Sequence, residues 1–269
     1  AHRRGANMGM MSIVSPDILS FICCKDDPAK FTNFNISVKV PDAFMATLQT
    51  DPGRPHMVTN FRTGQRYQLP RSLAIGHYGL QDLVPAGANE TACYSVREVW
   101  ELIVTSAHRT GEPGVCFIDR VNEKNPTPAL GRIEALNPCG EQPLLNEEAC
   151  CLGSIDVSKF VLPDGRDIDW EALGNTVRWA VRFLDNVVDA SSYPIPQIRD
   201  ATLSNRKIGL GVMGFADALI LMGRRYDSEE AISFARKLSG FIQEVAHRAS
   251  QELAGQRGTF PNWPGSIWD

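Results

Sequence analysis

The sequence has 269 residues, a net charge of −4 and 43% hydrophobic residues, which is enough apolar material for a packed core. The negative charge argues against a nucleic-acid polymer as the main partner. The sequence has no run of about 18 apolar residues, so no segment is predicted to cross a membrane. Seven cysteines without the spacing of a small disulfide-bonded domain, and no signal peptide at the start, predict a reducing, cytoplasmic location.

Both ends of the sequence are expected to be cuts through a longer protein. The chain begins in a basic run that continues into Gly5, and it stops at Trp268 and Asp269 without a closing element. We therefore expect residues 1–269 to form a single, partial domain.

The first predicted elements are a strand and an irregular segment. Residues 31–41 alternate apolar and polar side chains, which predicts a strand that ends at Pro41. Its apolar face is expected to hold Phe34, Ile36, Val38 and Val40. Residues 49–94 are rich in proline, glycine and polar residues, which indicates an irregular excursion with a short hairpin.

A helix is predicted to begin at Ser95, because Glu98 completes a capping box. Its buried stripe is expected to be Val99, Leu102, Ile103 and Ala107. The glycine- and proline-containing segment 111–114 should end this helix, and residues 115–118 are then predicted to form a buried strand.

Two longer helices are predicted in the second half of the chain. One covers about 170–190 with Asp169 as its cap, and the other covers about 229–254 between Ser228 and Gly255. The alternation of strands and helices along the chain predicts an α/β fold.

The segment with the clearest chemical character is Asn137-Pro138-Cys139-Gly140-Glu141. Proline and glycine on either side place the cysteine on a tight, rigid loop. In an extended loop, residues two apart project to the same side, so the amide of Asn137, the thiol of Cys139 and the carboxylate of Glu141 can converge on one small ligand. A carboxylate raises the pKa of a nearby thiol, so the pattern favours hydrogen-atom transfer at sulfur over nucleophilic attack. Taken singly, an inert loop cysteine, a turn former and a solvated acid would explain these residues.

This stretch, which continues as NPCGEQPLL and EACCLGSI, resembles the finger-loop motif of the ribonucleotide reductases, and most of all their adenosylcobalamin-dependent class. Other segments resemble the same family in the same order: residues 3–20, 32–38, 118–128 and 204–217. The resemblance implies a ten-stranded α/β barrel made of two parallel five-stranded halves. Residues 137–141 would lie on a loop through its centre.

The resemblance also implies a role for each residue of the loop. Cys139 matches the thiyl-radical cysteine that takes the 3′ hydrogen atom from the ribose. Glu141 matches the carboxylate that accepts the 3′-hydroxyl proton, and Asn137 matches the amide that hydrogen-bonds the ribose hydroxyls. The backbone of 137–141, with Pro138 and Gly140, would line the pocket for a ribonucleoside di- or triphosphate.

Cys150 matches one member of the redox-active dithiol of the family, and its partner would lie outside this sequence. Thioredoxin or glutaredoxin would then reduce the disulfide. Cys151 departs from the family pattern, in which asparagine is usual, and a vicinal thiol could compete for oxidation. The alternative is that both cysteines are packing residues.

The resemblance further implies adenosylcobalamin as cofactor, dNTP or ATP effectors and a homodimer in the full-length protein. Arg3, Arg4 and Gly5 resemble part of the loop that relays effector identity to the substrate base, although a solvated basic turn is the simpler explanation. The isolated fragment should be inactive, because the other redox cysteine and the effector site would lie outside it.

Alternative functions are open at this point. The radical could come from a separate metal subunit, or the chain could be a non-catalytic remnant that only binds nucleotide. Residues 209–214 satisfy G-x-G-x-x-G, with Asp227 or Glu229 placed to bind a ribose, as in an NAD-dependent dehydrogenase. The polar residues before this motif favour a structural role instead, in which small residues let a helix pack closely.

The remaining cysteines have the character of structural residues: Cys23, Cys24, Cys93 and Cys116. No cysteine and histidine residues have zinc-site spacing, so no metal site is expected.

Overall fold

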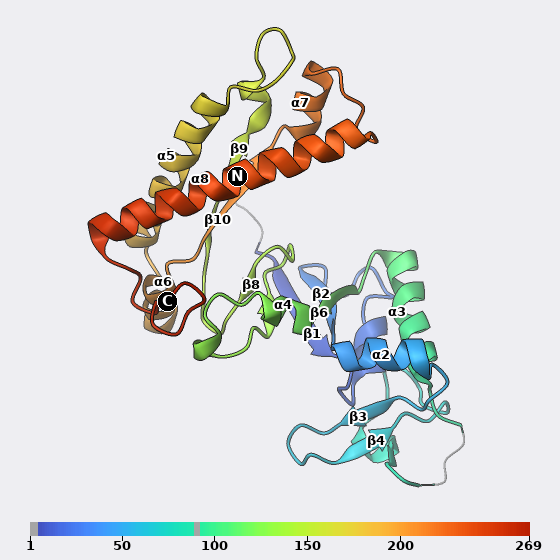
Figure 1. Cartoon of the computed structure of the whole chain (residues 1–269). Coiled ribbons are helices and arrows are strands. Elements are labelled where there is room, and N and C mark those ends of the chain that lie inside the picture. Colours follow the sequence, from blue (N-terminus) through green and yellow to red (C-terminus); the bar gives the residue numbers. More distant parts are fainter. Residues whose placement is uncertain (1–4, 89–91) are drawn as a thin grey trace. The chain divides into compact units, whose positions relative to one another are not determined.

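A computed structural model describes residues 5–88 and 92–269 of the chain (Figure 1). The backbone divides into two units, Ala1–Asn146 and Glu147–Asp269, each with its own hydrophobic core. Both units combine strands and helices, so the predicted α/β class is confirmed. The single domain over residues 1–269 stays a prediction.

The first unit contains a parallel sheet in the order β1-β2-β6. Its strands are β1 (Asn7–Ser12), β2 (Phe34–Val40) and β6 (Gly114–Phe117). β2 confirms the strand expected over 31–41, and three of the predicted apolar positions are buried: Ile36, Val38 and Val40. Ser37 on the opposite face is buried as well, because a central parallel strand is covered on both faces.

Four helices accompany this sheet: α1 (Ile18–Cys23), α2 (Asp42–Thr50), α3 (Val96–Thr110) and α4 (Ile118–Glu123). The capping box of α3 is confirmed, because Ser95 Oγ accepts from the Glu98 amide at 3.2 Å and Glu98 Oε2 accepts from the Ser95 amide at 2.8 Å. The strand expected over 115–118 is wrong at its end. Phe117 is 43% exposed, and Ile118 already begins α4.

The excursion expected over 49–94 folds into a small antiparallel sheet that includes the predicted hairpin. Its elements are β3 (Met57–Thr59), β4 (Arg66–Gln68), the 3₁₀ turn η1 (Leu80–Asp82) and β5 (Val84–Pro85). The excursion is not merely irregular, because its side chains join the core of the first unit. That core includes Ile13, Leu19, Val38, Val58, Leu69, Val99 and Ile103.

The first unit ends with the 3₁₀ turn η2 (Pro128–Leu130) and a two-stranded antiparallel hairpin. The hairpin strands are β7 (Ala135–Leu136) and β8 (Pro143–Leu144), so the predicted loop at 137–141 is the connection between them.

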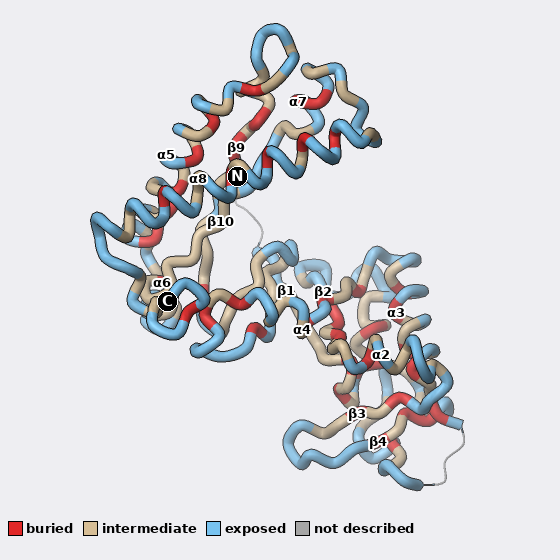
Figure 2. The backbone as a smooth tube through the Cα atoms, in the orientation of Figure 1, coloured by how far each residue is buried: buried red, intermediate tan, exposed pale blue. Residues whose placement is uncertain are grey.

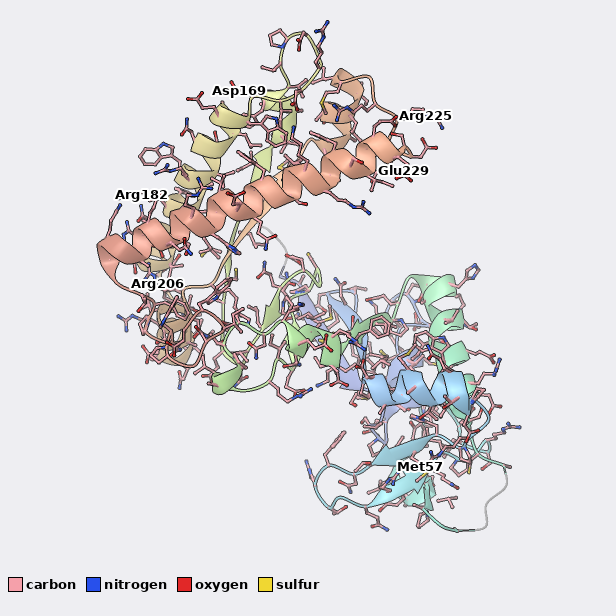
Figure 3. The ribbon with its side chains drawn as sticks, in the orientation of Figure 1. Met57, Asp169, Arg182, Arg206, Arg225 and Glu229 are labelled. Atoms are coloured by element: carbon pink, nitrogen blue, oxygen red, sulfur yellow. The ribbon has the colours of Figure 1, made fainter. Side chains whose placement is uncertain are left out.

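The second unit pairs β9 and β10 in parallel, and α5 and α6 form the crossover between them. Its elements are β9 (Cys151–Asp156), η3 (Val157–Phe160), α5 (Trp170–Ala190), α6 (Pro196–Asn205), β10 (Ile208–Met213), α7 (Phe215–Leu221) and α8 (Glu229–Arg257). Asp169 caps α5 as predicted, and its position at the start of that helix is labelled in Figure 3 together with Glu229 at the start of α8.

The core of the second unit lies among β9, α5, α7 and α8, and Figure 2 shows buried positions recurring along these elements. Its members include Ile155, Leu173, Val177, Leu219, Phe234, Leu238 and Ile242. The predicted end of the last helix is wrong: Gly255 lies inside α8, which continues to Arg257 and is followed by Gly258. One glycine costs a helix only about 1 kcal/mol, which tertiary packing of a long helix outweighs.

The glycines of 209–214 lie on a strand and not in a helix, and this strand, β10, contacts helix α5. They belong to β10 and to the turn after it. Gly214 has φ +67°, and a Cβ atom there would lie 2.0 Å from Oδ1 of Asp156. The pattern therefore reflects a close approach of two segments within the protein.

Candidate functional site

The connection between β7 and β8 is a tight turn with Cys139 at its tip. The backbone amide of Asn137 donates to the backbone carbonyl of Gln142 at 3.2 Å, and the backbone amide of Gly140 donates to the backbone carbonyl of Asn137 at 2.9 Å. Gly140 has φ +82°, a left-handed conformation that glycine adopts without strain. The rigid loop predicted from the proline and glycine around Cys139 is therefore present.

The side chains of this turn differ in exposure. Cys139 and Glu141 are exposed, whereas Asn137 and Pro138 are half-buried. Asn137 Oδ1 accepts a hydrogen bond from the Gln142 amide at 2.9 Å. The oxygen of this side chain therefore holds the turn, which leaves the amide nitrogen as the group suited to donate to a ligand.

The sheet of the first unit anchors the turn through contacts that the sequence did not reveal. The Asn35 side chain of β2 donates to the carbonyl of Pro138. On the same face of β2, Lys39 Nζ lies 2.7 Å from Oε2 of Glu134, just before β7. The only hint in the sequence was that these two side chains share the polar face of the predicted strand. Their partners lie about one hundred residues away.

Cys150 belongs to the second unit and directly precedes β9. Its thiol is half-buried and lies 3.6 Å from the carbonyl of Cys151, the first residue of β9. Two residues earlier, the buried carboxylate of Glu148 lies 2.6 Å from the ammonium of Lys207. Neither of these charged residues was among the predicted site residues.

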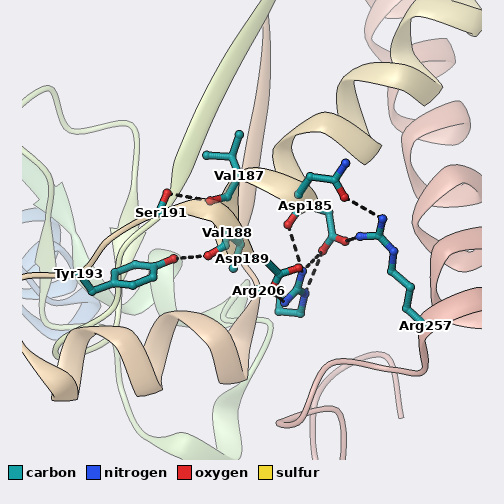
Figure 4. A network of polar contacts seen from close by, with 9 residues as sticks. Asp185, Val187, Val188, Asp189, Ser191, Tyr193, Arg206 and Arg257 are labelled. Atoms are coloured by element: carbon teal, nitrogen blue, oxygen red, sulfur yellow. Dashed lines mark hydrogen bonds and ion pairs between the residues drawn. The ribbon is translucent and has the colours of Figure 1, made fainter.

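A cluster of charges fixes the chain where α6 meets β10 (Figure 4). Arg206 has φ +47° and donates to Oδ1 of Asp185 at 2.9 Å and to both oxygens of Asp189 at 2.7 and 2.8 Å. The hydrogen bond to Asp189 is the main cause that raises the pKa of Arg206, and the same contact lowers the pKa of Asp189. Arg257 of α8 also contacts Asp185, so this corner is tied to two helices.

The other cysteines have surroundings that favour packing. Cys93 and Cys116 are buried, and burial raises the pKa of the Cys116 thiol. Burial is also the main cause that raises the pKa of Cys23 and of Cys24. A higher pKa leaves less thiolate, so the thiols of Cys23, Cys24 and Cys116 are less reactive than an ordinary thiol.

The remaining predicted features concern the start of the chain and metal binding. Arg3 and Arg4 lie outside the described residues, and Gly5 is exposed just before β1. Within residues 5–88 and 92–269, no group of three or more His, Cys, Asp or Glu side chains could hold a metal ion. No helix in the same ranges has the length and apolar character needed to cross a membrane.

Comparison with known proteins gives one consistent result. The family described as "Ribonucleotide reductase, barrel domain" matches residues 1–269. A vitamin B12-dependent ribonucleoside-diphosphate reductase of Thermoplasma acidophilum is 44% identical over 99% of this chain and 31% of its own length. A protein of the same description from Mycobacterium tuberculosis strain CDC 1551 is 42% identical over 98% of this chain and 34% of its own length. A ribonucleoside-diphosphate reductase subunit alpha of Chlamydia muridarum is 40% identical over 64% of this chain and 17% of its own length. The chain thus spans about a third or less of the length of these relatives.

Proposed function

Because the chain belongs to the ribonucleotide reductase barrel-domain family, we propose that the complete protein reduces ribonucleotides to 2′-deoxyribonucleotides, the precursors of DNA. The observation that carries this proposal is the turn between Asn137 and Gln142, which presents an exposed thiol beside an exposed carboxylate. The substrate would be a ribonucleoside di- or triphosphate, and the relatives described as diphosphate reductases favour the diphosphate.

In the proposed reaction, the thiyl radical of Cys139 takes the 3′ hydrogen atom from the ribose. Glu141 accepts the proton of the 3′-hydroxyl group, and the amide of Asn137 donates to a ribose hydroxyl. The 2′-hydroxyl group takes a proton from one of two reducing thiols and departs as water. The two thiols supply two electrons and the hydrogen for the 2′ carbon, and they become a disulfide. Glu141 then returns its proton to the 3′ oxygen, and Cys139 returns its hydrogen atom to the 3′ carbon.

Cys150 is proposed as one of the two reducing thiols, with a partner cysteine outside residues 1–269. Cys150 directly precedes β9. Its side chain is half-buried, which limits the access of other oxidants to the thiol. A thioredoxin or glutaredoxin would restore the dithiol. Cys151 is the first residue of β9, so its backbone is committed to strand pairing with Ile208.

Adenosylcobalamin is proposed as the cofactor, since two relatives are described as vitamin B12-dependent. When bound, it supplies a carbon-centred radical that takes the hydrogen atom of a thiol. The turn fits such a group, because Cys139 is exposed and a Cβ atom added to Gly140 would meet nothing within 4 Å. We assign no residue of this chain to holding the cofactor.

For the complete protein we also propose a single barrel domain over residues 1–269, a cytoplasmic location, a homodimer and control by dNTP or ATP effectors. Arg3, Arg4 and Gly5 would belong to the loop that responds to the effector. These proposals rest on the family alone.

A radical delivered by a separate metal subunit is the second candidate, because the chlamydial relative is described as a subunit alpha. A dehydrogenase is disfavoured, since the glycines of 209–214 lie in β10 and in the turn that meets Asp156. A remnant that binds nucleotide without turnover would fail every test of activity.

One experiment separates these candidates. Full-length protein is incubated with a ribonucleoside diphosphate and a dithiol, with and without adenosylcobalamin. The proposal predicts formation of deoxyribonucleotide only with the cofactor, together with release of 5′-deoxyadenosine. Turnover only after an iron or manganese subunit is added would establish the second candidate. The absence of turnover both with the cofactor and with such a subunit would contradict the proposed function.

A further inference from the structure

The segment that carries Cys150 has no regular structure of its own. Residues 148–150 lie between the boundary of the two units and the start of β9, and they belong to neither a helix nor a strand. A disulfide forms only when the two Cβ atoms come within about 3.5–4.5 Å of one another. A cysteine on such a segment therefore depends on neighbouring side chains to hold its position.

Glu148 anchors this segment through side-chain contacts. Its side chain is 0% exposed, and its Oε2 lies 2.6 Å from Lys207 Nζ. Its Oε1 accepts a hydrogen bond from Asn205 Nδ2 at 2.8 Å. Asn205 Oδ1 in turn accepts from Asn262 Nδ2 at 2.6 Å. Both oxygens of the buried carboxylate are thus bound by groups that are themselves held.

The strand register brings Lys207 and Cys150 to the same end of the β9–β10 ladder. Cys151 pairs with Ile208 at the start of the parallel ladder between β9 and β10, so Lys207 and Cys150 occupy matching positions one residue earlier. Between Asn205 and Lys207, Arg206 is fixed to α5 by Asp185 and Asp189. The corner between α6 and β10 is therefore a rigid support for Glu148.

We propose that Glu148 and Lys207 are positioning residues for the thiol of Cys150. This inference rests on the redox role proposed above for Cys150. Burial of an ion pair carries a desolvation cost that offsets much of its attraction, so such a pair is weak evidence for stability alone. A buried pair with matched hydrogen bonds does restrict the chain to one arrangement, and here that arrangement fixes the residue two positions before the thiol.

The test measures the dithiol–disulfide equilibrium of Cys150 and its partner in the full-length protein, in thioredoxin redox buffers. Glu148→Gln and Lys207→Met should each shift the equilibrium about tenfold toward the dithiol, which corresponds to a potential about 30 mV less negative. Looser positioning predicts the same direction for both variants. An effect of charge alone predicts opposite directions, because one variant removes a negative charge near the thiol and the other a positive charge.

Matched controls come from surface ion pairs of the same unit. Arg178 and Glu252 lie 2.7 Å apart, and Lys237 and Asp167 lie 3.2 Å apart. Glu252→Gln and Lys237→Met repeat the two chemical changes away from Cys150 and should leave the equilibrium unchanged.

A milder variant covers the case in which loss of a buried charge prevents folding. Asn205→Ala removes one hydrogen bond to Glu148 and keeps the ion pair, so it should shift the equilibrium about threefold in the same direction. Unchanged equilibria, or opposite shifts for the two charge variants, would overturn the positioning role while wild-type turnover still supports the proposed function. A wild-type protein that forms deoxyribonucleotide without any disulfide at Cys150 would overturn the redox role of Cys150 itself.

Discussion

Asn35, near the start of the central strand β2, donates a hydrogen bond from its side chain to the carbonyl of Pro138, the residue before Cys139. The turn that presents the thiol is therefore held by a strand one hundred residues earlier in the chain. Lys39, on the same face of β2, binds Glu134 before the turn begins. The polar face of one strand thus fixes the segment that leads to Cys139.

Asn35→Ala in the full-length protein should lower kcat about ten- to a hundredfold, because a small displacement of a reacting group has large effects on rate. The free energy of unfolding should fall by only about 1 kcal/mol, since one exposed hydrogen bond is lost. Initial rates and chemical denaturation measure the two effects. Asn60→Ala, which removes a local contact to Arg62 in the excursion, is the matched control and should keep full activity. Normal turnover in Asn35→Ala would show that this anchor is not needed.

Gly140→Ala tests the backbone of the turn. An alanine at φ +82° is expected to cost about 1–2 kcal/mol, while the added Cβ atom meets nothing within 4 Å. Gly64 has φ +73° and similar open space, so Gly64→Ala should destabilise the protein equally. Only the change at Gly140 should reduce turnover. Equal activity of the two variants would contradict a functional role for the shape of this turn.

His56 should make stability depend on pH. It is 2% exposed, its Nε2–H donates to the carbonyl of Ile13 at 2.7 Å, and burial lowers its pKa from the ordinary value of 6.5. The unfolded chain therefore binds a proton more readily than the folded protein. This contribution to stability is complete above pH 6.5 and is lost as the pH falls from there toward the lowered pKa of the folded state.

Urea denaturation at pH 7.5 and pH 5.5 measures this effect. His56→Gln should remove a large part of the pH dependence in that window, whereas the exposed His77, changed to Gln, should leave it unaltered. An unchanged pH dependence in His56→Gln would show that other groups are responsible.

Cys150→Ser should limit the full-length protein to a single turnover or none, because the disulfide that supplies the two electrons could not form. Cys151→Ser is the adjacent control and should sustain many turnovers with thioredoxin. The product formed per enzyme molecule distinguishes the two variants. Sustained turnover in Cys150→Ser would defeat its assignment as a reducing thiol.

The features that the sequence predicted well are local ones. Ser95 and Glu98 are three residues apart, and Asp169 caps the helix that directly follows it, so short-range hydrogen bonding decides both helix starts. The alternation in β2 was visible because successive side chains of a strand point to opposite faces of the sheet. The rigid turn around Cys139 followed from the backbone preferences of its proline and glycine.

The features that it missed depend on tertiary contacts. Asn35 meets Pro138 across 103 positions and Lys207 meets Glu148 across 59, and no periodicity marks either pair. Gly255 looked like a helix end, but the packing of α8 continues through it to Arg257. The close approach of Gly214 to Asp156 was also missed, because it is visible only in three dimensions.

The most direct test of the account is Cys139→Ser in the full-length protein, with nucleotide binding and deoxyribonucleotide formation measured on the same preparation. A hydroxyl group cannot host the radical under these conditions, so product formation should vanish while nucleotide affinity stays within about twofold of the wild-type value. A Cys139→Ser protein that still reduces ribonucleotides would contradict the assignment of Cys139 as the radical-carrying residue.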